Sequence, residues 1–147
     1  MTMSEVLPPV VPRVVLDTNV LYAGLYSATG RSYQVLRALQ AGRLRLVLST
    51  PLLFEYEDVL GRRQADLSLS AADIGTVLDN LCAWADFQPV YFLWRPCLPD
   101  AKDDMVLELA VAAGGARIVT FNARDFGPAA RFGVGVCSPG ELLQSLP

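Results

Sequence analysis

The sequence predicts an α/β domain: a parallel sheet with helices on both of its faces. Short apolar runs alternate along the chain with longer segments that have helical periodicity. These runs lack the apolar-polar alternation of half-exposed strands, which indicates strands buried on both faces. No internal repeat or low-complexity tract divides the chain, and 147 residues suit one domain. We expect that domain at 13–147, preceded by a flexible proline-rich leader at 1–12.

The expected elements follow from apolar spacing and from residues that begin or end helices. Gly42 and Gly114 end two helices, because glycine favours the left-handed conformation that often follows a helix. Thr50 and Pro51 suit the N-cap and first helical position of another. Strands are expected at 13–16, 44–48, 90–93 and 118–120, with a weak fifth at 134–137. Helices are expected at 30–41, 50–60, 70–84, 103–113 and 139–146.

Composition excludes several classes of protein and of active site. No apolar run approaches the roughly 20 residues that span a bilayer, and the N-terminus lacks a secretory signal pattern. Three widely spaced cysteines, Cys82, Cys97 and Cys137, form no C-x-x-C pair and suit a reducing cytosol, so we expect a cytoplasmic protein. We interpret these cysteines as buried small side chains. The chain has no histidine, which removes Ser-His and Cys-His nucleophile pairs and histidine-based zinc hydrolases. Carboxylates are therefore the expected tools of an enzyme.

Charge is distributed unevenly along the chain. The net charge is −3 and the pI is about 4.8, a balance that argues mildly against a nucleic-acid partner. The first 63 residues nevertheless hold seven arginines against five acids, whereas the remainder holds five basic residues against ten acids. Two interpretations fit this asymmetry: an ordinary solvated surface, or a basic surface that faces an acidic pocket.

Acidic and amide side chains follow the ends of predicted strands. Asp17 comes directly after the first strand, and Asn122 and Asp125 follow the fourth. Ligands of parallel sheets bind beyond the carboxyl ends of the strands, where the strand order reverses. If the first and fourth strands are neighbours, Asp17 and Asn122 share one crevice. Crowded carboxylates need a cation, and an all-oxygen ligand set selects Mg²⁺ or Mn²⁺.

Each of these acids also has a purely structural interpretation. Asp17 and its two successors suit the cap of a following helix. Asp103 and Asp104 suit the first turn of the helix that they open, and the polar residues after the fourth strand are common turn formers. Glu55 and Glu57 flank an apolar helical stripe on opposite edges, so spacing does not choose between them.

Three stretches of the chain occur together in the order and at the spacing of one known family. They are VVLDTNV, STPLLFEYEDVL and DAKDDMVLELAVAAGGARIVTFNARDF, and the similarity covers 13 to about 137. With them the sequence resembles the PIN-domain ribonucleases, above all bacterial PIN proteins that are toxins of toxin–antitoxin pairs. The resemblance implies a sheet of order 3-2-1-4-5. It also implies an endoribonuclease that hydrolyses RNA with Mg²⁺ or Mn²⁺, and a cognate antitoxin protein as partner.

The resemblance also implies roles for individual residues. It selects Glu55 over Glu57, because Glu55 precedes Val59 by four residues as in the family. Many relatives carry Asp at the position of Asn122, so a second metal would be held less strongly here. The implied catalytic, metal-binding residues are Asp17, Glu55, Asp104 and Asp125, supported by Asn19, Asp103, Thr120 and Asn122, while Asp100 has no assigned role. From charge alone, Arg31, Arg43 and Arg45 are interpreted as guides for the RNA backbone.

Two other functions fit parts of the pattern. A catalytically weak or inactive module of the same fold, which binds RNA or protein, agrees with the acidic pI. A phospho-acceptor receiver domain also places an aspartate after its first strand. It needs a lysine after a late strand, however, and the one lysine, Lys102, precedes a helix. The apolar stripe between Ile74 and Trp84 has two interpretations as well, a core face or a homodimer face.

Overall fold

The computed structural model describes residues 11–91, 98 and 100–147. The predicted leader at 1–12 lies almost entirely outside the described residues, as does Cys97. The strands are β1 (Arg13–Leu16), β2 (Arg45–Leu48), β3 (Ala85–Phe87), β4 (Arg117–Val119) and β5 (Val136–Cys137). The helices are α1 (Thr18–Tyr26), α2 (Arg31–Gln40), α3 (Thr50–Arg62), α4 (Gln64–Leu67), α5 (Ala71–Ala83), α6 (Ala101–Ala113), the 3-10 helix η2 (Ala123–Phe132) and α7 (Pro139–Gln144).

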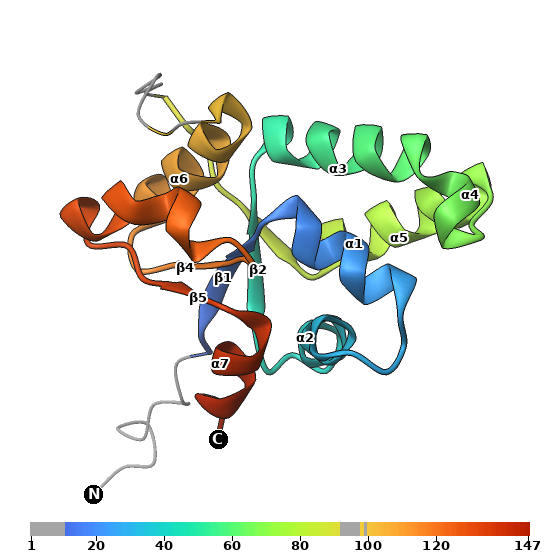
Figure 1. Cartoon of the computed structure of the whole chain (residues 1–147), viewed down its shortest axis with the longest axis horizontal. Coiled ribbons are helices and arrows are strands. Elements are labelled where there is room, and N and C mark those ends of the chain that lie inside the picture. The colour runs from blue at the N-terminus through green and yellow to red at the C-terminus, as the bar shows by residue number, and fades with distance from the viewer. Residues whose placement is uncertain (1–10, 92–97, 99) are drawn as a thin grey trace, which may run out of the picture.

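The strands form one parallel sheet in the order β3-β2-β1-β4-β5, which confirms the predicted fold class and strand order. The order reverses at β1, since the chain first moves outward to β3 and then returns to the other side of β1. Helix α6 lies on one side of β1 and β2, and α1 and α2 lie on the other (Figure 1). Apolar residues of the central strands, including Val15, Val47 and Ile118, are completely buried between these layers. No helix in the described part of the chain is long and apolar enough to cross a membrane.

The third strand is shorter and earlier than predicted. β3 pairs with β2 through Ala85 to Phe87, whereas Val90 and Tyr91 of the predicted strand at 90–93 lie outside any strand and 92 and 93 are not described. The reason is that β3 is an edge strand. Its Asp86 is exposed and pairs with Arg45 at 2.6 Å, so apolar content does not mark it.

Three helices have no predicted range, and several predicted helices begin or end elsewhere. α1, α4 and η2 are additional, and α3 is capped by Ser49 and not by Thr50, since the Ser49 hydroxyl accepts the Leu52 amide. α6 begins two residues earlier than predicted, at Ala101. The stripe of α5 lies largely against the core, with Ile74 and Leu81 buried.

Gly24 allows α1 to approach α2 closely. A Cβ atom at Gly24 would lie 2.7 Å from Leu36 Cδ1 and 3.0 Å from the Ser32 carbonyl oxygen, both too short for normal packing. A larger side chain would therefore force the two helices apart. This close contact holds α1, whose first residue follows Asp17, against the rest of the fold.

Candidate active site

Asp17 and Thr120 meet because β1 and β4 end at the same level. Leu16 lies opposite Val119 in the parallel ladder, so the next residue of each strand emerges at the same edge of the sheet. The Asp17 amide donates to the Val119 carbonyl oxygen at 2.9 Å. The Thr120 hydroxyl donates to Asp17 Oδ2 at 2.7 Å. The switch point of the sheet therefore fixes the position of the Asp17 carboxylate.

Asp17 also caps the helix that follows it. Its Oδ1 accepts the Thr18 amide at 2.9 Å, and its backbone is extended as expected of an N-cap. Burial raises the pKa of Asp17, and the hydrogen bonds from Thr120 and Thr18 partly oppose this rise. The charges of Asp125 and Asp100 raise this pKa further. The capping interpretation of Asp17 is thus correct, and it does not exclude a role in the hollow beside it.

A hollow of about 170 Å³, here called the acid hollow, opens between Asp17, α3 and α6. Its acidic side chains are Asp17, Glu55, Asp100 and Asp103. Glu55 faces the hollow, whereas Glu57 is exposed to solvent. Tyr56 ties α3 to the same place, because its buried hydroxyl donates to the Leu16 carbonyl oxygen at 2.5 Å. Acids from three elements therefore share one small space.

The two acids in the first turn of α6 occupy different environments. Asp103 lines the hollow, and its burial, together with the charges of Asp17, Asp100, Asp125 and Asp104, raises its pKa to about 6. Asp104 is only 1% exposed, and its Oδ1 accepts the Leu98 amide at 3.0 Å. Successive residues of a helix point about 100° apart, so the two carboxylates cannot share one direction. The acid that lines the hollow is Asp103, although the resemblance implied the catalytic role for Asp104.

Asn122 and Asp125 lie at the start of η2, beyond the end of β4. The Asn122 amide donates to Thr120 Oγ1 at 3.0 Å, and the Asp125 amide donates to the Asn122 carbonyl oxygen at 2.9 Å. Both side chains are exposed and neither lines the acid hollow. Asp125 is nevertheless near enough for its charge to raise the pKa of Asp17 and of Asp103. It is therefore a rim residue of the acid cluster.

Comparison with protein families agrees with this arrangement. A sequence profile of the PIN domain matches residues 13–124. The chain belongs to the PIN-domain family. PIN domains are generally nucleases that act on nucleic acids, and they typically use divalent metals. The match includes every acid of the hollow and ends one residue before Asp125. No curated protein matches the chain significantly.

Two residues of this PIN domain had no predicted part in the site. Asp100 lines the hollow and caps α6, because its Oδ1 accepts the Lys102 amide at 2.9 Å. Lys102 Nζ lies 3.7 Å from Glu55 Oε1 and brings a positive charge to the rim. The stretch DAKDD held the signal, since Asp100 and Asp103 stand about one helical turn apart.

Asn19 has a less defined place in the PIN domain. Its Oδ1 is buried and has no hydrogen-bond partner within the described part of the chain. Its predicted role as a support for Asp17 is therefore not carried by a hydrogen bond between the two side chains, and it stays a prediction. Of the predicted supports, Thr120 is the residue that holds Asp17 directly.

The arginines predicted to guide RNA lie at different ends of the PIN domain. Arg45 begins β2 and is paired with Asp86, and Arg43 donates to the Pro147 carbonyl oxygen at 3.4 Å. Both therefore lie at the amino end of β2, opposite the carboxyl ends where the acids meet. Arg31, by contrast, lines a second hollow together with Phe121. The arrangement favours Arg31 and gives no support to the other two.

The donor set of the acid hollow suits a hard divalent cation that keeps some of its waters. Over residues 11–91, 98 and 100–147, no three acidic, cysteine or histidine side chains lie close enough to hold an ion directly. Mg²⁺ is commonly bound through one or two carboxylates while it retains several waters. Burial first, and then the charges of the neighbouring aspartates, raise the pKa of Asp103, and a bound cation would stabilise its charged form. All-oxygen ligands and crowded charge therefore fit Mg²⁺ or Mn²⁺.

Proposed function

We propose that this PIN domain is an endoribonuclease that uses Mg²⁺ or Mn²⁺ at the acid hollow. The observation that carries the proposal is that Asp17, Glu55, Asp100 and Asp103 line one hollow at the switch point of the sheet. Family membership supports a nuclease. The choice of RNA rests on the resemblance of the strand-end motifs to those of PIN ribonucleases.

We assign metal binding to Asp17, Glu55 and Asp103, with Asp125 as an additional acid at the rim. Asp104 is proposed as a positioning residue, because it accepts the Leu98 amide just before α6 and does not line the hollow. This assignment revises the roles that the resemblance implied for the two adjacent acids. The metal-binding role of Asp125 requires its exposed side chain to turn toward the acid hollow.

The chemistry requires no side-chain nucleophile, in accord with a chain that has no histidine. When bound, a divalent ion makes water a stronger nucleophile and stabilises the charge that develops on the phosphate. Thr120 and the Thr18 amide hold the two oxygens of Asp17 in fixed directions. The exposed ammonium group of Lys102 provides a positive charge at the rim, where a phosphate would enter.

We further propose that the protein is a cytoplasmic toxin with a cognate antitoxin as partner. This rests on the resemblance to bacterial PIN toxins. A gene for a small antitoxin beside this one, whose co-expression restores growth of cells expressing the PIN domain, is the expected finding. A homodimer is a separate proposal, and light scattering of the purified protein tests it through the molar mass.

A second candidate is an RNA- or protein-binding module without catalytic activity. Two observations favour it: Lys102 already pairs with Glu55, and the described acids form no direct three-ligand group. If this candidate is correct, calorimetric titration with Mn²⁺ gives no binding heat, and RNA stays intact at millimolar metal concentrations.

Cleavage of a mixed RNA pool in Mg²⁺, Mn²⁺ or EDTA tests the nuclease proposal. The wild type is expected to cleave with either metal and not in EDTA. Asp17→Asn is expected to lower the rate at least about 100-fold, since loss of a metal ligand exceeds the cost of losing a residue that merely supports one. Asp79→Asn, which removes an exposed aspartate on α5, is the matched control and should retain full activity. Equal cleavage by the wild type and a folded Asp17→Asn variant would refute the mechanism.

A further inference from the structure

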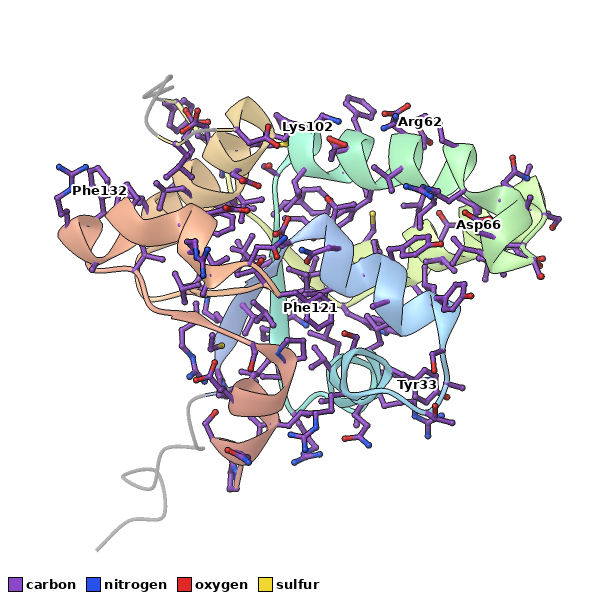
Figure 2. The ribbon with its side chains drawn as sticks, viewed as in Figure 1. Tyr33, Arg62, Asp66, Lys102, Phe121 and Phe132 are labelled. Atoms are coloured by element: carbon purple, nitrogen blue, oxygen red, sulfur yellow. The ribbon has the colours of Figure 1, made fainter. Side chains whose placement is uncertain are left out.

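Aromatic side chains gather in a second hollow, lined by α1, by the residues that lead into α2 and by Phe121. This hollow has a volume of about 450 Å³ and is here called the aromatic hollow. In the view of Figure 2, Phe121 lies near the centre and Phe132 at the outer edge. The aromatic hollow is lined by Tyr22, Ala23, Tyr26, Ser27, Gly30, Arg31, Ser32 and Phe121.

Two aromatic rings of this hollow, those of Tyr26 and Phe121, are exposed to solvent, and the third, that of Tyr22, is partly exposed. Tyr26 is 63% exposed and Phe121 is 52% exposed, although both are large apolar side chains that folding usually buries. Tyr22 and Tyr26 are stacked, with ring centroids 5.9 Å apart and planes inclined by 24°. The Arg63 guanidinium lies 5.7 Å from the centre of the Tyr22 ring. Exposed aromatic faces beside arginine are typical of surfaces that bind single-stranded nucleic acid.

Residues that line the aromatic hollow are close in sequence to residues of the acid cluster. Phe121 directly follows Thr120, whose hydroxyl binds Asp17. Tyr22 and Tyr26 lie on the helix that Asp17 caps, about 7.5 and 13.5 Å along its axis from Asp17 by the helical rise. An RNA strand with one phosphate at the acid hollow would therefore reach the aromatic rings within one or a few nucleotides.

The polar groups of the hollow suit a nucleotide and not a purely apolar ligand. Arg31 provides a cation, and its side chain packs beside Gly140 at the start of α7. Ser32 is buried, and its hydroxyl has no hydrogen-bond partner within the described part of the chain. A base edge or a ribose hydroxyl would give Ser32 a partner, provided that the side chain rotates toward the hollow.

We propose that the aromatic hollow binds an unpaired base of the RNA that is cleaved at the acid hollow. The base stacks on Phe121 and the tyrosine pair, while Arg31 contacts the adjacent backbone phosphate. The inference rests on the proposed nuclease function, and it adds that the substrate is single-stranded at this position. A duplex keeps its bases stacked inside the helix, so it cannot present one to these rings.

Binding of a fluorescein-labelled ten-residue oligo(A) RNA, measured by fluorescence anisotropy in EDTA, tests the proposal without cleavage. Phe121→Ala is expected to weaken binding about fivefold or more, from the usual contribution of one stacked base. Phe121→Trp should bind at least as tightly as the wild type, whereas Phe121→Leu should resemble Phe121→Ala. Tyr26→Ala provides a second test, since Tyr26 is exposed at the end of its helix. Phe132→Ala, a loss of an exposed ring elsewhere, should bind as the wild type does.

Two results overturn the proposal. The first is that folded Phe121→Ala and Tyr26→Ala variants bind the RNA as tightly as the wild type does. The second is that these variants lose equal affinity for single-stranded and for double-stranded RNA. The first would leave the rings as a protein-docking surface. A separate cleavage assay of the unmodified protein in Mn²⁺ keeps the two proposals apart. Cleavage with unchanged binding by the variants removes the base site alone, whereas aromatic-dependent binding without cleavage removes the nuclease function alone.

Discussion

Asp103 carries a negative charge that its surroundings disfavour. Its carboxylate lies in the acid hollow with Asp17, Glu55 and Asp100, and its pKa is raised from 3.8 to about 6. The folded protein therefore binds more protons at this group than the unfolded chain does between these two values. Stability falls as pH rises through that window, and the cost is fully present above pH 6. We expect a bound cation to offset this loss of stability, because it would stabilise the charged form of Asp103.

Asp103→Asn is therefore expected to stabilise the metal-free protein at pH 7. The gain should be on the order of 1 kcal/mol, a value already reduced for the solvent screening of a partly exposed group. It should shrink as pH falls from 6 toward 4, because Asp103 is then protonated in the folded protein and begins to be protonated in the unfolded chain as well. Urea unfolding in EDTA at several pH values measures it, with the exposed Glu57→Gln as control. A gain that does not depend on pH would contradict the explanation.

Elements differ in how far the sequence could predict them. β1, β2 and β4 are apolar strands buried between helices, so their hydrophobic runs located them within about one residue. The predicted position of the third strand was wrong, because β3 is an edge strand with an exposed Asp86 and has no such run. α6 is buried over most of its circumference, including Leu107, Leu109 and Ala110. Its periodicity therefore marks no solvent face, and the rotation that separates Asp103 from Asp104 could not be predicted.

The position of α3 decides where Glu55 lies, and no local sequence pattern predicts that position. Asp17 was predicted from its place after a strand, whereas Glu55 required the family resemblance. The buried hydroxyl of Tyr56 provides the physical reason, since its hydrogen bond to the Leu16 carbonyl fixes α3 against the end of β1. Such a contact joins residues 40 positions apart and leaves no local pattern.

Tyr56→Phe is expected to remove this hydrogen bond with little change in shape. Unfolding free energy should fall by about 1 kcal/mol, the usual net value of one hydrogen bond. Cleavage should slow at unchanged KM for RNA, because Glu55 is less firmly positioned relative to Asp17. Tyr33→Phe on α2 is the matched control, since Tyr33 does not line the acid hollow. If Tyr56→Phe and Tyr33→Phe have equal activity, the positioning role of Tyr56 is excluded.

Across the whole molecule, the fold places the acidic cluster and two of the arginines at opposite ends of the sheet. Strand order brings acids from β1, α3 and α6 to one end of the sheet, while Arg43 and Arg45 lie at the other end. Both hollows are lined in part by α1: Thr18 lines the acid hollow, and Tyr22 and Tyr26 line the aromatic hollow one and two turns further along the helix. A single RNA strand that runs along α1 would contact both hollows. This path, and not overall charge, is the basis on which we expect an acidic chain to act on RNA.

The most direct test of the central claim is anomalous diffraction from crystals soaked in Mn²⁺. We predict a manganese peak in the acid hollow, bounded by Asp17, Glu55 and Asp103, and its loss in crystals of Asp103→Asn. Asp104→Asn crystals should keep the peak if the variant folds, because Asp104 does not line the hollow. A hollow without manganese at millimolar concentrations, or a peak that depends on Asp104 and not on Asp103, would contradict the account.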